Sequence, residues 1–156
     1  MEQNKKVNII GAGLAGCECA HILAENGIKV KLYEMKPIKY SEAHSNENFA
    51  EIVCSNSFKS NLITNACGLL KEELRRLGSE LIRIADEVKV PAGQALAVDR
   101  EEFSKRVTEE LEKNEEELNL INDKSVGFPQ TANMIKNKKK FLVKEGPDGK
   151  PITYKT

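Results

Sequence analysis

The chain has 156 residues and a formal net charge of zero, with 24 Lys and Arg against 24 Asp and Glu. This length suits one domain with a sizeable core. No run approaches the roughly 18 to 20 apolar residues of a membrane span, and no apolar leader follows the start. We therefore expect a cytoplasmic protein without a membrane segment. The even charge hides an asymmetry, since residues 123–156 carry 8 Lys against 3 acids.

A glycine-rich turn near the start of the chain has the GxGxxG spacing of dinucleotide-binding loops. Gly11, Gly13 and Gly16 follow a short apolar run at residues 7–10, which predicts a strand. Gly11 allows the tight turn from strand to helix, Gly13 lets the backbone approach a pyrophosphate, and Gly16 lets the helix pack closely on the strand. The start of the helix then offers free N–H groups and a positive dipole end to the phosphates.

The elements after the glycines complete the unit. An amphipathic helix is predicted for residues 14–26 and a second strand for residues 28–33, ending on Glu34. Glu34 lies 21 residues beyond Gly13, where a carboxylate can accept hydrogen bonds from ribose hydroxyls. The side chains predicted to face the sheet are Ala15, Cys19, Ile22 and Leu23. The residues predicted to bind the dinucleotide are Gly11, Ala12, Gly13, Leu14, Ala15, Gly16 and Glu34.

A Ser- and Asn-rich stretch at residues 35–67 follows, and it is far too long for an ordinary connection. Loops of this length are usually functional or disordered. The stretch contains embedded apolar side chains, which indicate that it packs against something. These apolar residues are Phe49, Ile52, Val53, Phe58, Leu62 and Ile63. We therefore predict a long ordered insertion after the second strand.

The next predicted element is one helix over residues 68–87. An i,i+4 pair between Glu72 and Arg76 supports it. The apolar face of this helix is predicted to contain Leu70, Leu74, Leu77 and Leu81.

Two further strands and a helix are predicted after it. Residues 95–98 read as a short strand, and Asp99 then starts a helix as its N-cap, with Glu102 completing a capping box. This helix places Phe103, Val107 and Leu111 on one face, and it ends near Asn114. The last strand is predicted for residues 118–121. The elements together indicate an α/β fold with a nucleotide-binding βαβ unit.

The four cysteines, Cys17, Cys19, Cys54 and Cys67, do not form a metal-binding pattern. They include no CxxC and no nearby pairing with histidine, so no zinc site is expected. In a reducing compartment they are expected to remain thiols. Cys17 and Cys19 point to different sides of the first helix, and both are predicted to be packing residues.

Several segments carry a family resemblance. They read GAGLAG, LYEMKP, AEIVCSNSFKSN, NACGLLKEELRRLGS and VPAGQALAVDREEF. In order and spacing, residues 6–122 closely resemble the N-terminal part of the bacterial folate- and FAD-dependent tRNA (uracil-5-)-methyltransferases, the TrmFO family. That family is similar to flavoproteins of the glucose-inhibited division protein A type.

The resemblance implies a fold, an activity and cofactors. The implied fold is an incomplete Rossmann-like FAD/NAD(P)-binding βαβ fold with the insertion after the second strand. Family members transfer a one-carbon unit from methylenetetrahydrofolate to carbon 5 of a uridine in the tRNA T-loop, with electrons from FAD that NAD(P)H reduces again. Some members are thought to act on ribosomal RNA, and both targets stay open, as does the oligomeric state. Residues 11–16 match the FAD phosphate loop, and Glu34 matches the acid on the adenosine ribose.

Cys54 matches a cysteine implicated in covalent chemistry in this family. Uracil carbon 5 is a weak nucleophile, and a thiolate adding at carbon 6 would generate a reactive enolate. Cys54 either attacks the base or assists the passage of the one-carbon unit through the flavin. The alternative interpretation is a buried structural thiol.

Three other positions have two interpretations each. His44 either contacts the flavin or polarises a thiol, or it is a solvated loop histidine. Arg100 either reaches a phosphate or pairs with Glu34 or Glu73. The lysines at position 136 and at 138–140 either contact RNA phosphates or form a solvated charge run.

Residues 1–122 are expected to form the N-terminal part of an FAD-binding domain, and residues 123–156 a basic, turn-rich tail unlike the family. TrmFO proteins are several hundred residues long, so this chain alone is expected to be inactive as a methyltransferase. Two alternative functions are an inactive nucleotide-binding remnant and a generic flavin or nicotinamide oxidoreductase. The second would explain the glycine turn and Glu34 but not the CSNSFKSN segment.

Overall fold

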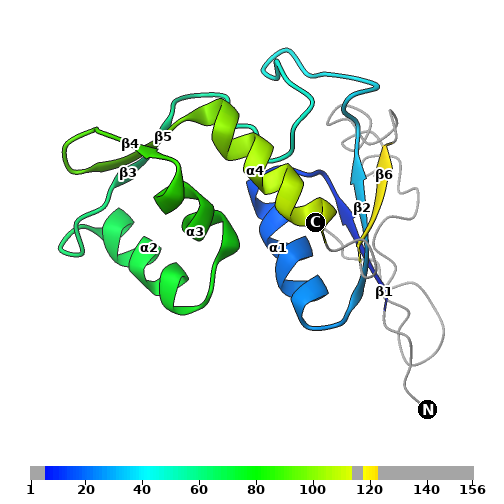
Figure 1. Ribbon diagram of the computed structural model, residues 1–156, viewed down its shortest axis with the longest axis horizontal. Coiled ribbons are helices and arrows are strands. Elements are labelled where there is room, and N and C mark those ends of the chain that lie inside the picture. The colour runs from blue at the N-terminus through cyan, green and yellow to red at the C-terminus, as the bar shows by residue number, and fades with distance from the viewer. Residues whose placement is uncertain (1–5, 114–117, 123–156) are drawn as a thin grey trace, which may run out of the picture.

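The computed structural model describes residues 6–113 with their side chains and the backbone of residues 118–122 (Figure 1). The described elements, in chain order, are β1 (Lys6–Ile10), α1 (Leu14–Glu25), β2 (Lys29–Glu34), β3 (Ser57–Ser60), α2 (Ala66–Arg76), α3 (Glu80–Glu87), β4 (Lys89–Val90), β5 (Ala95–Val98), α4 (Arg100–Glu112) and β6 (Leu118–Asn122). No helix in this part of the chain is long and apolar enough to cross a membrane.

A parallel sheet in the order β1–β2–β6 positions the start of the chain. Val7 of β1 pairs with Val30 of β2, and Leu32 of β2 pairs with Leu120 of β6. Helix α1 connects β1 to β2 and packs on β2, with α4 beside it (Figure 1). The predicted α/β fold with an incomplete Rossmann-like βαβ unit is therefore confirmed, as are the strands predicted at 95–98 and 118–121.

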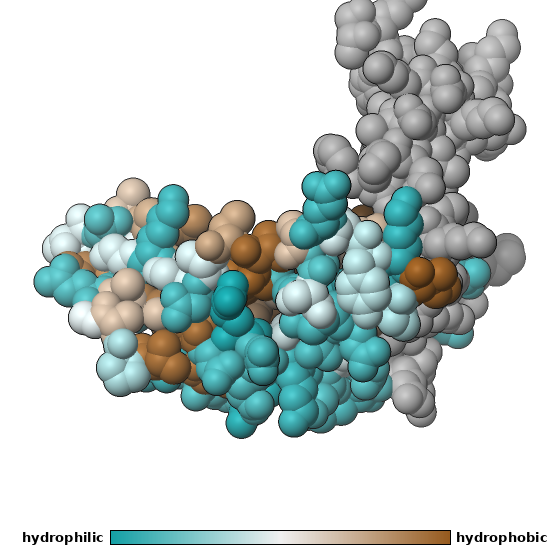
Figure 2. Space-filling model, turned by 90° about the horizontal axis from the view of Figure 1, so that it is seen from above, coloured by the Kyte–Doolittle hydropathy of each residue, from teal (hydrophilic) through white to brown (hydrophobic). Residues whose placement is uncertain are grey.

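A second, antiparallel sheet in the order β3–β5–β4 lies at the other end of the molecule with α2 and α3 (Figure 1). Its strand β3 belongs to the long stretch after β2, so the insertion contains regular structure, as expected. Phe58 of β3 packs edge-on against Phe103 of α4, with ring centroids 5.5 Å apart. Seen from above, apolar residues gather on the surface of this end among polar ones (Figure 2).

The predicted sheet-facing stripe of α1 is largely wrong. The buried residues of α1 are Cys17, Ala20 and Ala24, whereas Ala15, Cys19 and Ile22 are exposed and Leu23 is partly buried. The reason is steric, because small side chains on the buried face let the helix approach the sheet closely. Cys19 lies on the other side of the helix from Cys17 and is exposed, so the packing role predicted for it is wrong.

The helix predicted over 68–87 is two helices. Gly78 adopts φ +77° after the end of α2, and Ser79 caps α3 by accepting a hydrogen bond from the Ile82 N–H at 3.3 Å. The chain turns at this point, so Leu70 and Leu77 are 56% and 79% exposed and do not share a buried face with Leu81. A glycine followed by a capping serine is the usual signal of such a break.

Helix α4 forms as predicted except for half of its capping box. The Asp99 side chain accepts from the N–H groups of Glu101 and Glu102, and Phe103, Val107 and Leu111 are buried. The Glu102 carboxylate does not complete the box, since it accepts from Arg106 at 2.9 Å. The Asp99 N–H instead donates to the Val88 carbonyl at 3.1 Å.

Candidate functional site

The glycine turn between β1 and α1 has the geometry that its spacing predicts. Gly11 adopts φ +95°, in the left-handed region that favours glycine. Its N–H donates to the Tyr33 carbonyl of β2 at 2.8 Å. A Cβ atom at Gly16 would lie 2.0 Å from the Gly11 carbonyl oxygen, so only glycine allows the helix to start this close to the strand.

The front of this turn is open. Gly13 is the N-cap of α1 and has no side chain to bond the helix start. A Cβ atom built on Gly13 would meet no protein atom within 4 Å, and Leu14 and Ala15 are exposed in the first helical turn. Since first-turn N–H groups lack intrahelical partners, the turn presents free donors to an open space. These residues fit the pyrophosphate of a dinucleotide such as FAD.

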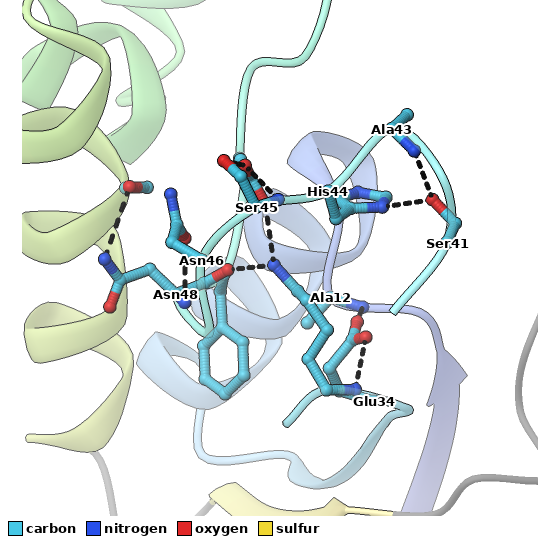
Figure 3. A network of polar contacts seen from close by, with 12 residues as sticks. Ala12, Glu34, Ser41, Ala43, His44, Ser45, Asn46 and Asn48 are labelled. Carbon is cyan, nitrogen blue, oxygen red and sulfur yellow. Dashed lines mark hydrogen bonds and ion pairs between the residues drawn. The ribbon is translucent and has the colours of Figure 1, made fainter. Parts of the chain in front are cut away.

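Glu34 lies against this turn at the end of β2 (Figure 3). Its side chain is nearly buried, with 8% exposed. One carboxylate oxygen accepts from the Ala12 N–H at 2.7 Å, and the other accepts from the N–H groups of Met35 and Lys36 at 2.9 and 3.0 Å. A carboxylate has about four acceptor positions, so capacity remains for a ribose hydroxyl. The structure thus brings together the predicted acid and the predicted loop.

The stretch after β2 returns to the same turn (Figure 1). The Ala50 N–H donates to the Ala12 carbonyl at 2.8 Å, and the Cys17 thiol donates to that carbonyl at 3.2 Å. Ala50 is buried and adopts φ +50°. Burial raises the pKa of the Cys17 thiol to about 12, against a smaller opposing effect of the Ala50 N–H. Cys17 is therefore an inert thiol beneath the docked stretch.

A buried ion pair holds this stretch from its other side. The Lys36 ammonium donates to the Asn48 carbonyl and lies 3.4 Å from the Glu51 carboxylate, and the two side chains are 3% and 7% exposed. Burial alone would raise the pKa of Glu51, but hydrogen bonds from Ser45 and the Lys36 charge outweigh it and lower the pKa. No sequence pattern indicated this pair, because an irregular segment without any period separates its two residues.

Cys54 is exposed and follows Ala50 by four residues. Four residues of chain span at most about 14 Å, so Cys54 lies within that reach of the glycine turn. Its exposure contradicts the alternative interpretation as a buried structural thiol. Cys67 is half-buried near the start of α2 and Cys19 is exposed on α1.

The contacts of the remaining candidate residues do not place them at the glycine turn. His44 is half-buried, and its Nδ1 lies 2.6 Å from the Ser41 hydroxyl in the same loop (Figure 3). Arg100 is exposed at the start of α4, and no ion pair with Glu34 or Glu73 occurs within residues 6–113. The lysines at 136 and 138–140 lie outside the described residues. No three His, Cys, Asp or Glu side chains gather as a metal site in the described part.

Comparison with known proteins identifies the family. Residues 6–146 match the family described as glucose inhibited division protein A. The chain belongs to this family. The match covers both the glycine turn and the docked stretch. The family match also continues beyond residue 122. The division of the chain there into an FAD-binding part and a basic tail therefore stays a prediction.

Curated relatives sharpen the comparison. The chain is 54% identical over 129 residues to proteins named methylenetetrahydrofolate–tRNA-(uracil-5-)-methyltransferase TrmFO from Staphylococcus aureus strains JH9, Newman and N315. The aligned residues are 83% of this chain and 29% of each relative. The resemblance to the TrmFO family is thereby confirmed, and the chain spans less than a third of the length of these relatives.

Proposed function

We propose that this chain is the FAD-binding part of a methylenetetrahydrofolate-dependent tRNA uridine C5 methyltransferase. The observation that carries the proposal is the docking of the Cys54 stretch on the glycine turn, through the Ala50 N–H and the Ala12 carbonyl. A flavin-binding loop and an exposed thiol then belong to one site. The similarity to TrmFO proteins supports the same function, and it extends through segments that a generic oxidoreductase or a bare nucleotide-binding remnant would not need.

Each residue of the turn has a role in holding the cofactor. The amides that follow Gly13 bind the pyrophosphate, while Gly11 and Gly16 keep the turn tight against β1. Glu34 accepts from a hydroxyl of the adenosine ribose with its remaining lone pairs. The bound FAD supplies electrons for reduction of the transferred one-carbon unit. NAD(P)H as the source of these electrons, a tRNA substrate and a cytoplasmic location belong to the same proposal.

Cys54 is proposed as the nucleophile toward the uridine. Its thiolate adds to carbon 6 of the uracil ring, and the electron pair of the C5–C6 double bond makes carbon 5 nucleophilic. Carbon 5 then bonds to the methylene carbon, whose bond to tetrahydrofolate breaks, and the two electrons supplied by FAD reduce the methylene to a methyl. Loss of the C5 proton and cleavage of the C6–S bond restore the C5–C6 double bond and the thiolate. An exposed position in a polar loop allows Cys54 to reach a base, in contrast to the buried Cys17.

Flavin binding tests the first half of this proposal. We expect the chain to bind FAD, measured by quenching of flavin fluorescence. Gly13→Val places a branched side chain in the open space before the turn and should weaken binding by about 100-fold or more, because it blocks the close approach of the pyrophosphate. The control is Ala92→Val, which introduces the same valine side chain at an exposed position of the β4–β5 connection. Equal flavin affinity in the Gly13→Val chain would show that the site is misassigned.

A chimaera tests the second half. Residues 6–122 of this chain replace the matching segment of the Staphylococcus aureus relative, and the product is supplied with methylenetetrahydrofolate, FAD, NADPH and unmodified tRNA. We expect 5-methyluridine from the chimaera, none from its Cys54→Ser variant, and a normal yield from Cys19→Ser. The 156-residue chain alone is expected to form none, because positioning of folate and RNA supplies much of the rate. A fully active Cys54→Ser chimaera would refute the nucleophile.

A further inference from the structure

Lys36 is a buried lysine whose ammonium is held by a carbonyl and a carboxylate further along the insertion. It lies two residues beyond the end of β2, and its side chain is 3% exposed. Its ammonium donates to the Asn48 carbonyl and approaches the Glu51 carboxylate to 3.4 Å. A buried ammonium is costly unless it is paired and hydrogen-bonded, so these partners fix where residues 48–51 lie.

The same short segment is attached to the glycine turn. Between the two Lys36 partners, Ala50 donates its N–H to the Ala12 carbonyl at 2.8 Å. Ala50 holds φ +50°, a conformation that a non-glycine residue keeps only when its surroundings impose it. Lys36 therefore supplies part of the restraint that seats Ala50 on the turn.

Cys54 lies between two residues, Glu51 and Asn56, that contacts with other parts of the chain hold in place. On one side is Glu51, three residues earlier, held by Lys36 and by the Ser45 N–H at 2.9 Å. On the other side is Asn56, whose carbonyl accepts from the Val98 N–H of β5 at 2.8 Å. Three residues of chain span at most about 11 Å, so the position of Cys54 follows the position of Glu51.

We propose that Lys36 is the positioning residue for Cys54. Its buried ammonium fastens residues 48–51 to the chain just beyond β2 and so keeps Cys54 beside the glycine turn. This inference rests on the proposed function in so far as Cys54 is the nucleophile that needs a fixed place. Lys36 itself touches neither the flavin nor the base.

The contacts of Ala12 link the proposed cofactor site to the docked insertion. The Ala12 N–H donates to Glu34, and the Ala12 carbonyl accepts from Ala50. A dinucleotide that binds the turn and Glu34 therefore also acts on the docked insertion. In the parent chain, bound FAD should slow the alkylation of Cys54 by about fivefold or more, the lower range of measured couplings between sites.

The test compares Lys36→Met, which removes the charge and keeps an unbranched side chain, with the parent, with Lys36→Arg and with the control Lys29→Met on exposed β2 surface. Without ligand, we expect amide exchange of residues 45–53 to rise about tenfold in Lys36→Met, while β2 and α4 keep their protection. Alkylation of Cys54 by iodoacetamide should rise relative to the exposed Cys19, and the protection by FAD should disappear. Lys36→Arg should restore most of the parental amide exchange and of the protection of Cys54 by FAD. Lys29→Met should match the parent.

Two results would overturn the inference. One is a Lys36→Met chain with parental exchange at residues 45–53 and a parental ratio of Cys54 to Cys19 alkylation. The other is equal loosening of every element, since Lys36 would then be an ordinary stabilising residue. If Lys36→Arg does not fold, Glu51→Gln replaces it and should show the same local loosening as Lys36→Met. A parent chain that takes up no FAD would contradict the proposed function, while the ligand-free exchange still decides the role of Lys36.

Discussion

The glycine turn and the docked insertion are held in place by different means. The turn is fixed by short-range backbone geometry, with Gly11 at φ +95° and Gly16 in contact distance of Gly11. The insertion is fixed by distant side chains, since Lys36 holds Glu51 fifteen residues away and the Phe49 N–H donates to the Thr108 hydroxyl 59 residues away at 2.8 Å. The difference implies a rigid glycine turn and an exposed thiol, Cys54, on a segment that single substitutions can release.

The largest effect on the free energy of unfolding is expected at Gly16, and it distinguishes Gly16 from Gly13. Gly16→Ala places a Cβ atom 2.0 Å from a backbone oxygen, so it should lower the free energy of unfolding by about 3 kcal/mol or more. Gly13→Ala projects into open space and should cost about 1 kcal/mol or less, the usual loss at an N-cap. Urea unfolding followed by circular dichroism measures both. Equal costs for the two variants would contradict the division of roles within the turn.

A smaller effect is expected where α4 holds the insertion. Thr108→Val removes the acceptor of the Phe49 N–H and should cost about 1 to 2 kcal/mol, the penalty of an unpaired buried amide. Amide exchange should rise at residues 45–53 and stay unchanged at the turn. Thr64→Val, at an exposed position, is the control and should leave the free energy of unfolding within about 0.5 kcal/mol of the parent value. Loosening of both regions together would show that they are one cooperative unit.

The pH dependence of the insertion follows from Glu51. Its folded pKa is lowered from 4.5 by the Ser45 hydrogen bonds and by Lys36, against the opposing effect of burial. A lowered carboxyl pKa contributes stability in full above the unfolded value, and the contribution disappears as the pH falls through the folded value. Exchange at residues 45–53, expressed relative to the intrinsic rate at each pH, should therefore increase below pH 4.5 in the parent. In Glu51→Gln it should already be raised at neutral pH and respond less to acid; an acid response equal to the parent's would exclude Glu51 as its cause.

The smallest effect is expected far from both regions. Arg76→Ala breaks the solvent-exposed pair with Glu72, whose atoms are 3.0 Å apart. Exposed i,i+4 pairs contribute only about 0.3 to 0.5 kcal/mol, so the midpoint of urea unfolding should barely move. Flavin affinity and the ratio of Cys54 to Cys19 alkylation should equal those of the parent. A changed alkylation ratio would mean that α2 also positions the insertion.

The sequence predicts the local parts of this structure better than the long-range ones. The GxGxxG spacing determines the turn, and the Asp99 cap and the strand at 95–98 follow from patterns of a few residues. The break at Gly78–Ser79 also had a local signal, but the leucine spacing across it suggested one continuous helix. The buried face of α1 carries Cys17, Ala20 and Ala24, so the prediction, which combined Ala15 and Cys19 with Ile22 and Leu23, had the helix in the wrong rotation about its axis.

The long-range part of the site had no such signal. Lys36 and Glu51 lie in an irregular segment, where neither helical nor strand periodicity relates one position to another. Spacing places Glu34 at the end of β2, yet its hydrogen bond to the Ala12 N–H appears only once the chain is folded. The proposed role of Cys54 came from a family resemblance, since free cysteine is most often a packing residue.

We infer that the flavin loop and Cys54 form one site. The most direct measurement follows iodoacetamide labelling of Cys54 and Cys19 by peptide mapping during a titration with FAD, in the parent and in Gly13→Val. We expect Cys54 to become protected in proportion to bound flavin in the parent. Cys19 labelling should stay constant, and Gly13→Val should show no protection at the same FAD concentrations. Flavin that binds to the parent without changing the labelling of Cys54 would contradict the claim.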